Sequence, residues 1–97
     1  MILFEMMVGY PPFFSENPSD TCQKIIQWKK HFSIPIESNL SLEADNLIRK
    51  LVCPAETRLG VNGADEIKNH PFFKGFDWNN VRKMQAPFMP NVTIYNI

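Results

Sequence analysis

The side chains best suited to chemistry are two cysteines and two histidines, and their spacing does not gather them into a site. Cys22 and Cys53 lie 31 positions apart, no Cys-x-x-Cys pair exists, and His31 and His70 are too distant in sequence to indicate a zinc cluster. Each cysteine falls among apolar residues at helical spacing, which favours buried reduced thiols over a disulfide.

The aspartates also lack partners for acid–base catalysis. Asp20, Asp45 and Asp65 fall on predicted helix surfaces, and no serine or histidine stands at a spacing that would complete a dyad. Asp20 precedes Lys24 by four residues, and Asp45 precedes Arg49 by four, so both are predicted to form exposed ion pairs. The sequence therefore predicts no catalytic residue, no bound cofactor and no metal site in this chain.

The composition is that of one small globular domain: 97 residues, of which 44% are hydrophobic and 21% charged. Ten basic and ten acidic residues cancel, which argues against a nucleic-acid partner or an anionic membrane. The apolar run at the start is interrupted by Glu5 and is far shorter than the ~20 residues of a membrane span. We therefore expect no membrane contact and a cytoplasmic or nuclear location.

Proline and glycine divide the chain into short predicted helices. Residues 1–7 are apolar nearly all round, as in a buried helix, and Gly9 ends that helix. The next few residues must be extended or turned, because Pro11 and Pro12 fix φ. Asn17 then caps a second helix, with an apolar stripe of Cys22, Ile25 and Ile26 and a cationic last turn of Lys29, Lys30 and His31.

The third predicted helix has the most regular pattern. Ser41 caps it, Pro54 follows its end, and its apolar positions are Ala44, Leu47, Ile48, Leu51 and Val52. A short helix over residues 64–69 follows, and then an aromatic cluster of Phe72, Phe73, Phe76 and Trp78. Residues 86–97 read as an extended tail packed over a surface. No strand pairing is evident, so the predicted fold class is all-α.

Several motifs, in order and in register, resemble those of AGC-group serine/threonine protein kinases. Residues 4–13 resemble the end of helix F and the loop after it, and residues 58–73 resemble the H–I loop and helix I. Residues 77–78 and 86–90 resemble the start of the C-terminal tail. Residues 24–29, in which a tryptophan precedes a lysine, are similar to helix G of the NDR/LATS subgroup.

The resemblance implies a truncated C-terminal helical subdomain of the kinase large lobe. Residues 1–76 would carry the end of helix F and helices G, H and I, and residues 77–97 the start of the tail. A full-length kinase of this kind transfers the γ-phosphate of ATP to serine or threonine with Mg²⁺. This chain has no Gly-rich loop, HRD motif or DFG motif. We therefore expect it to be inactive alone and to bind neither ATP nor Mg²⁺.

The resemblance also suggests roles for particular residues. Arg58 looks like the arginine that, in intact kinases, forms a buried ion pair with the glutamate that ends the activation segment. That glutamate is missing here, so we expect Arg58 to be solvated and unpaired; the plainer interpretation is an exposed loop arginine.

The loop after the first helix lies, by resemblance, beside the substrate groove. Its candidate peptide-docking residues are Tyr10, Pro11, Pro12 and Phe13, to which Trp28 is added. The alternatives are a rigid turn with Phe13 packed beneath it and a tryptophan that covers the core.

Two hypotheses follow. In the first, the chain is a fragment of an active kinase, whose partners are the remainder of the kinase domain and a protein substrate; the position of Met1 inside a predicted helix favours this. In the second, it is a non-catalytic interaction module derived from a kinase. The apolar stripes would lack packing partners in the isolated chain, so we expect marginal stability and self-association.

Overall fold

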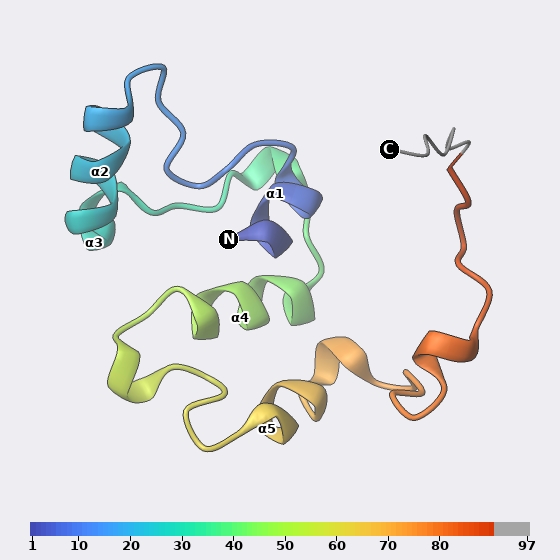
Figure 1. Cartoon of the computed structure of the whole chain (residues 1–97). Helices are drawn as coiled ribbons and strands as arrows, with labels where there is room; N and C mark the ends of the chain where they lie inside the picture. The colour runs from blue at the N-terminus through green and yellow to red at the C-terminus, as the bar shows by residue number, and fades with distance from the viewer. Residues whose placement is uncertain (91–97) are drawn as a thin grey trace, which may run out of the picture.

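The computed structural model describes residues 1–90, a chain of short helices joined by turns with no strand in that range (Figure 1). Its α-helices are α1 (Ile2–Val8), α2 (Pro18–Ile26), α3 (Trp28–His31), α4 (Leu42–Leu51) and α5 (Ala64–Lys68). Its 3-10 turns are η1 (Ile36–Ser38), η2 (Ala55–Thr57), η3 (Pro71–Phe73) and η4 (Val81–Lys83). The predicted all-α class is confirmed for these residues, and no helix among them is long and apolar enough to cross a membrane.

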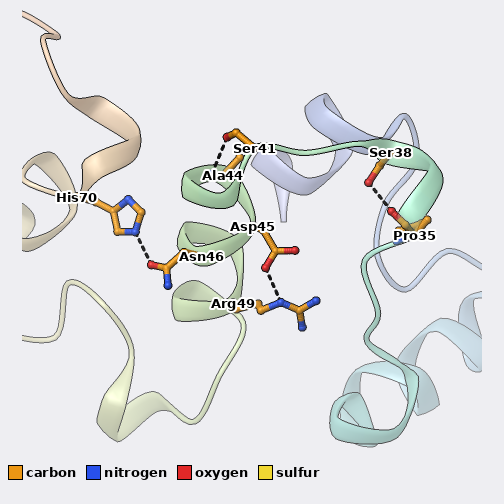
Figure 2. Close-up of polar contacts among 8 residues, drawn as sticks. All are labelled: Pro35, Ser38, Ser41, Ala44, Asp45, Asn46, Arg49 and His70. Carbon is orange, nitrogen blue, oxygen red and sulfur yellow. Dashed lines mark hydrogen bonds and ion pairs between the residues drawn. The ribbon is translucent and has the colours of Figure 1, made fainter.

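Three of the predicted helix ends, at Gly9, Asn17 and Ser41, are present in the structure. The Asn17 side chain accepts a hydrogen bond from the Ser19 amide, and the Ser41 hydroxyl accepts one from the Ala44 amide at 3.1 Å (Figure 2). Gly9 closes α1 in the left-handed conformation with φ 104°, which L-residues adopt at a cost. These local signals are sufficient to set the boundaries because each pairs a helix-end amide with a nearby acceptor.

The core is small. Its buried apolar side chains come from α1, from the loop after it and from α4, and they are Phe4, Phe13, Ala44, Leu47 and Ile48. Helix α4 also packs against η3, and α2 packs against α3.

The molecule is open compared with a folded domain of its size. Its radius of gyration is 16.6 Å, where a compact domain of this length has about 13 Å. Its accessible surface is 8279 Å², where a folded 11.3 kDa monomer exposes about 5,700 Å². Ile2, Met6 and Ile26 are each more than 70% exposed. Much of the apolar surface that the sequence provides is therefore not covered within the part of the chain described.

The expected stripe of the second helix is not buried. Ile25 is 50% exposed, Ile26 is 72% exposed and Cys22 is exposed. The prediction that both cysteines are buried is wrong for Cys22, and Cys53 is only partly buried; both are free thiols. The physical reason is that amphipathic spacing predicts which face of a helix can pack, while burial needs a second surface, and no segment of residues 1–90 covers the stripe of Cys22, Ile25 and Ile26.

The helix and ion-pair predictions also need correction around this stripe. α2 ends at Ile26 because Gln27 leaves the helical region, with φ −102° and ψ 40°, and Trp28 begins a separate turn. The expected Asp20–Lys24 pair does not form: Lys24 Nζ donates to the Phe14 carbonyl at 2.8 Å instead. Exposed ion pairs are weak, so a fixed carbonyl within reach competes with them.

The other predicted pair is confirmed, because Arg49 Nε contacts Asp45 Oδ1 at 2.7 Å (Figure 2).

The first helix is less buried than the sequence predicted, since Phe4 is its one buried residue. The tail departs from the prediction as well: Phe88 is 77% exposed and Met89 68% exposed, so residues 86–90 do not pack on the molecule. The rest of the predicted tail, residues 91–97, lies outside the described residues.

Candidate functional site

Arg58 stands at the end of η2, which begins after Pro54. Its side chain is exposed, and its Nη2 donates a hydrogen bond to the Cys53 carbonyl at 2.9 Å. Within residues 1–90 it has no carboxylate at ion-pair distance. The guanidinium is therefore held in place on one side, and the rest of its donors face solvent. Its pairing with a glutamate of a longer protein stays a prediction.

An apolar hollow lies beside Arg58. Its volume is about 400 Å³, within the range of ligand and side-chain binding pockets. We call it the Arg58 hollow, and its lining consists of Met1, Phe13, Ile25, Trp28, Leu51, Val52, Cys53 and Arg58. It joins α1, α2, α3 and the end of α4, so it exists only in the folded chain. Arg58 is the one charged side chain in this lining.

Three of the six candidate residues from the sequence, Phe13, Trp28 and Arg58, thus come together around one cavity. Pro11 and Pro12 line a smaller adjacent hollow of about 240 Å³, which shares Phe13 and Ile25 with the first. Tyr10 lines neither hollow and is 48% exposed.

Phe13 is fixed by an aromatic chain under the loop. Its ring lies 6.2 Å from Phe32, which lies 5.8 Å from Phe4, which lies 6.2 Å from Tyr10. The tilted and edge-on arrangements are those that aromatic quadrupoles favour. Phe13 is only 5% exposed, so it packs beneath the loop, and its role in peptide docking stays a prediction. Sequence reasoning missed Phe32, whose isolated position after α3 gave no periodic signal.

The second buried feature is a polar contact that the sequence did not indicate. His70 Nε2 lies 2.7 Å from Asn46 Oδ1, and the Phe72 amide donates to His70 Nδ1 at 3.0 Å (Figure 2). Because Nδ1 accepts, the proton of the neutral ring is on Nε2 and is donated to Asn46. His70 is 6% exposed.

The surroundings of His70 disfavour its charged form. Burial lowers the pKa of His70 below its ordinary value of 6.5, the Lys50 ammonium lowers it further, and the Glu43 carboxylate opposes them in part. His70 is therefore a neutral structural link between α4 and η3.

Hydrogen bonds join the loop that carries Arg58 to α5. Glu66 Oε1 accepts from the Gly60 amide at 3.2 Å and from the Asn62 amide at 2.8 Å. Gly60 has φ +102°, and a Cβ placed there would lie 2.9 Å from Ile67 Cδ1. The predicted aromatic cluster is confirmed next to it, with Phe73 and Trp78 ring centroids 4.8 Å apart.

Metal-ligating side chains do not cluster within the described residues. No three His, Cys, Asp or Glu side chains of residues 1–90 gather where they could bind a metal ion. The cavities offer apolar walls with cations at their edges. This chemistry suits the docking of protein surfaces.

Comparisons with known sequences show what this chain is similar to. No family model matches the chain. Curated relatives are serine/threonine protein kinases, and almost the whole of this chain aligns with a short segment of each one.

It is 50% identical over 93 residues to serine/threonine-protein kinase CBK1 of Candida albicans, with 95% of this chain and 13% of that kinase aligned. It is 45% identical over 93 residues to CBK1 of Saccharomyces cerevisiae, with 95% and 12% aligned. It is 46% identical over 92 residues to serine/threonine-protein kinase cot-1 of Neurospora crassa, with 95% and 15% aligned. The chain thus spans about an eighth of the length of these relatives.

Proposed function

We propose that this chain forms the C-terminal helical part of the large lobe of an NDR/LATS-like serine/threonine protein kinase. In this role it supplies scaffold for the lobe and part of the face that docks protein substrates, and it is inactive alone. The full-length kinase transfers the ATP γ-phosphate to serine or threonine, and its ATP and Mg²⁺ sites lie in the part that this chain does not contain.

The observation that carries the proposal is the uncovered apolar surface around the Arg58 hollow. Its walls are apolar, one guanidinium stands at its edge, and Ile25 beside it is half exposed. A complementary surface therefore needs apolar side chains and one carboxylate. The remainder of a kinase domain, with a glutamate directed at Arg58, has this chemistry.

Reconstitution of a split kinase tests the proposal. The CBK1 kinase domain of Candida albicans is expressed without the segment that matches this chain, and the 97-residue chain is added as a separate polypeptide. We expect co-purification and recovery of peptide phosphorylation from radiolabelled ATP, with neither piece active alone.

Arg58→Leu should weaken the association and the recovered activity, while Arg82→Leu, a change of the same type on η4, should leave both unchanged. Turnover by the purified chain alone, or no association with the kinase remainder, would overturn the proposal. Sequencing of the transcript upstream of Met1 gives an independent answer, since an open frame encoding the HRD and DFG motifs supports it.

One observation favours the alternative, a non-catalytic interaction module. α4 is capped at Ser41 and buries Ala44, Leu47 and Ile48 within the chain itself, so a small core forms without further segments. A cooperative thermal melt without binding of an apolar dye would favour the module, whereas a broad melt with strong dye binding would favour the kinase fragment.

A further inference from the structure

A third hollow, which shares only Trp28 with the Arg58 hollow, lies where α2 ends and α3 begins. Its volume is about 380 Å³ and it is lined by Ile26, Gln27, Trp28, Lys29 and Lys30. We call it the α2–α3 hollow. It consists of consecutive residues, so its shape depends on the break between the two helices.

The break has a definite cause and consequence. Gln27 takes φ −102° and ψ 40°, which ends α2, and α3 begins directly after it at Trp28 (Figure 1). The two helices still contact each other, and the α2–α3 hollow lies at the residues where they meet. Ile26, at its edge, is 72% exposed.

The charge around this hollow has one sign. Between Gln23 and Phe32 there are no acidic residues, and the cationic residues are Lys24, Lys29 and Lys30. Lys24 is engaged by the Phe14 carbonyl. Lys29 and Lys30 have no carboxylate at ion-pair distance anywhere in residues 1–90, although the whole chain is formally neutral.

Lys29 is also partly ordered. Its Nζ lies 5.8 Å from the centroid of the Trp28 ring, a cation–π distance. The hollow thus presents an apolar floor with a positioned cation at its edge and a second one beside it. This pattern is complementary to an acidic peptide that carries one apolar side chain, since exposed ion pairs contribute little without apolar contact.

We propose that the α2–α3 hollow docks an acidic segment of a partner protein, whose apolar side chain contacts Ile26 and Trp28 while flanking carboxylates pair with Lys29 and Lys30. The concave shape favours a side chain over the flat surface of a membrane. This inference deepens the proposed docking role and rests on it, but its test does not need kinase activity.

The test is fluorescence anisotropy with a short fluorescein-labelled peptide in which one leucine is flanked on both sides by glutamates. Lys29→Glu combined with Lys30→Glu should weaken binding about tenfold or more, and rising salt should weaken it as well. The matched control is Arg82→Glu with Lys83→Glu, which reverses two adjacent cations on η4 and should leave binding unchanged. A peptide with serine in place of the leucine should bind more weakly, as should Ile26→Ser with the original peptide.

Circular dichroism verifies that each variant keeps its helix content, and Lys29→Gln with Lys30→Gln replaces the charge reversal if it does not. Equal weakening by both charge-reversed pairs would overturn the proposal, as would no binding by the unaltered chain. Binding of phosphatidylserine vesicles that depends on Lys29 and Lys30, without peptide binding, would instead identify a lipid surface. A chain that binds the peptide but does not reconstitute the split kinase disproves the proposed function alone; the opposite result disproves only this inference.

Discussion

His70 Nε2 donates a hydrogen bond to Asn46 Oδ1 across 2.7 Å, and this contact joins residues that lie 24 positions apart. Asn46 belongs to α4, the helix with most of the buried side chains, and His70 precedes η3, which packs against α4. The contact therefore links the capped core helix to the segment that follows α5.

Removal of this link should destabilise the chain. Asn46→Ala leaves the buried His70 N–H without its acceptor, and we expect the free energy of unfolding to fall by about 1–3 kcal/mol. Urea denaturation followed by circular dichroism measures it. Asn79→Ala is the control, because this exposed side chain makes no hydrogen bond within residues 1–90, and an equal loss there would contradict the assignment.

The stability of the chain should depend on pH through His70. Its pKa is lower in the folded chain than the ordinary 6.5 of the unfolded chain, so the unfolded chain takes up a proton first as the pH falls. Stability should therefore be level well above pH 6.5 and decrease as the pH falls below 6.5 toward the lowered pKa of the folded chain. Urea midpoints measured above and below pH 6.5 test this. The decrease should vanish in His70→Gln and persist in His31→Gln; persistence in both would exclude His70 as its source.

The Ser41 cap of α4 should contribute measurably to the free energy of unfolding. Ser41→Ala removes the acceptor of the Ala44 amide and should cost about 1 kcal/mol of stability, while Ser41→Gly should cost only a few tenths. Thermal melts of both variants check the order. Ser33→Ala, an exposed change outside any helix, should stay within about 0.5 kcal/mol of the parent chain.

Gly60 should tolerate alanine worse than Gly75 does. Both have positive φ, but only at Gly60 would the new Cβ meet another atom, Ile67 Cδ1 at 2.9 Å. Gly75→Ala should cost about 1–2 kcal/mol from backbone conformation, and Gly60→Ala should cost more. Ile67→Val deletes Cδ1, so a double-mutant cycle should show that it recovers part of the Gly60→Ala loss. If the losses of stability from the two substitutions simply add, the overlap between the new Cβ and Ile67 Cδ1 is relieved by another movement.

The isolated chain should self-associate through α2. Ile25 and Ile26 are exposed and border the two hollows, and replacement of both by serine should shift the association to higher protein concentration. Sedimentation velocity over a range of concentrations measures it. Ile36→Ser, at a residue that is 93% exposed on η1, should change it little; a change as large as that of the double variant would mean that general apolar exposure drives association.

The sequence predicts features that depend on neighbouring residues better than features that depend on contacts between distant parts of the chain. The bounds of α4 could be predicted because a serine cap and a regular stripe are local signals, and the core position of Ala44, Leu47 and Ile48 followed from that stripe. The break at Gln27 could not be predicted in this way, because no glycine or proline marks it. The sequence pattern therefore predicted one helix where the structure has two.

The candidate site shows the same division. Phe13 was expected to pack beneath its loop and does so. Its contact with Phe32 could not be predicted, because it depends on how the chain folds back after α3. The Asn46–His70 bond joins side chains with no sequence relationship that marks them. The exposure of Cys22 could not be predicted because it depends on which surfaces are absent from residues 1–90, and helical spacing contains no such information.

The uncovered face of α2 and the Arg58 hollow has a consequence for the life of the chain in a cell. Chaperones and proteases act on apolar surface that stays exposed, and small differences in how much is covered change protein abundance several-fold. If a second protein covers that face, we expect the amount of this chain in a cell to follow the supply of that protein. Chain made in excess of it should be degraded.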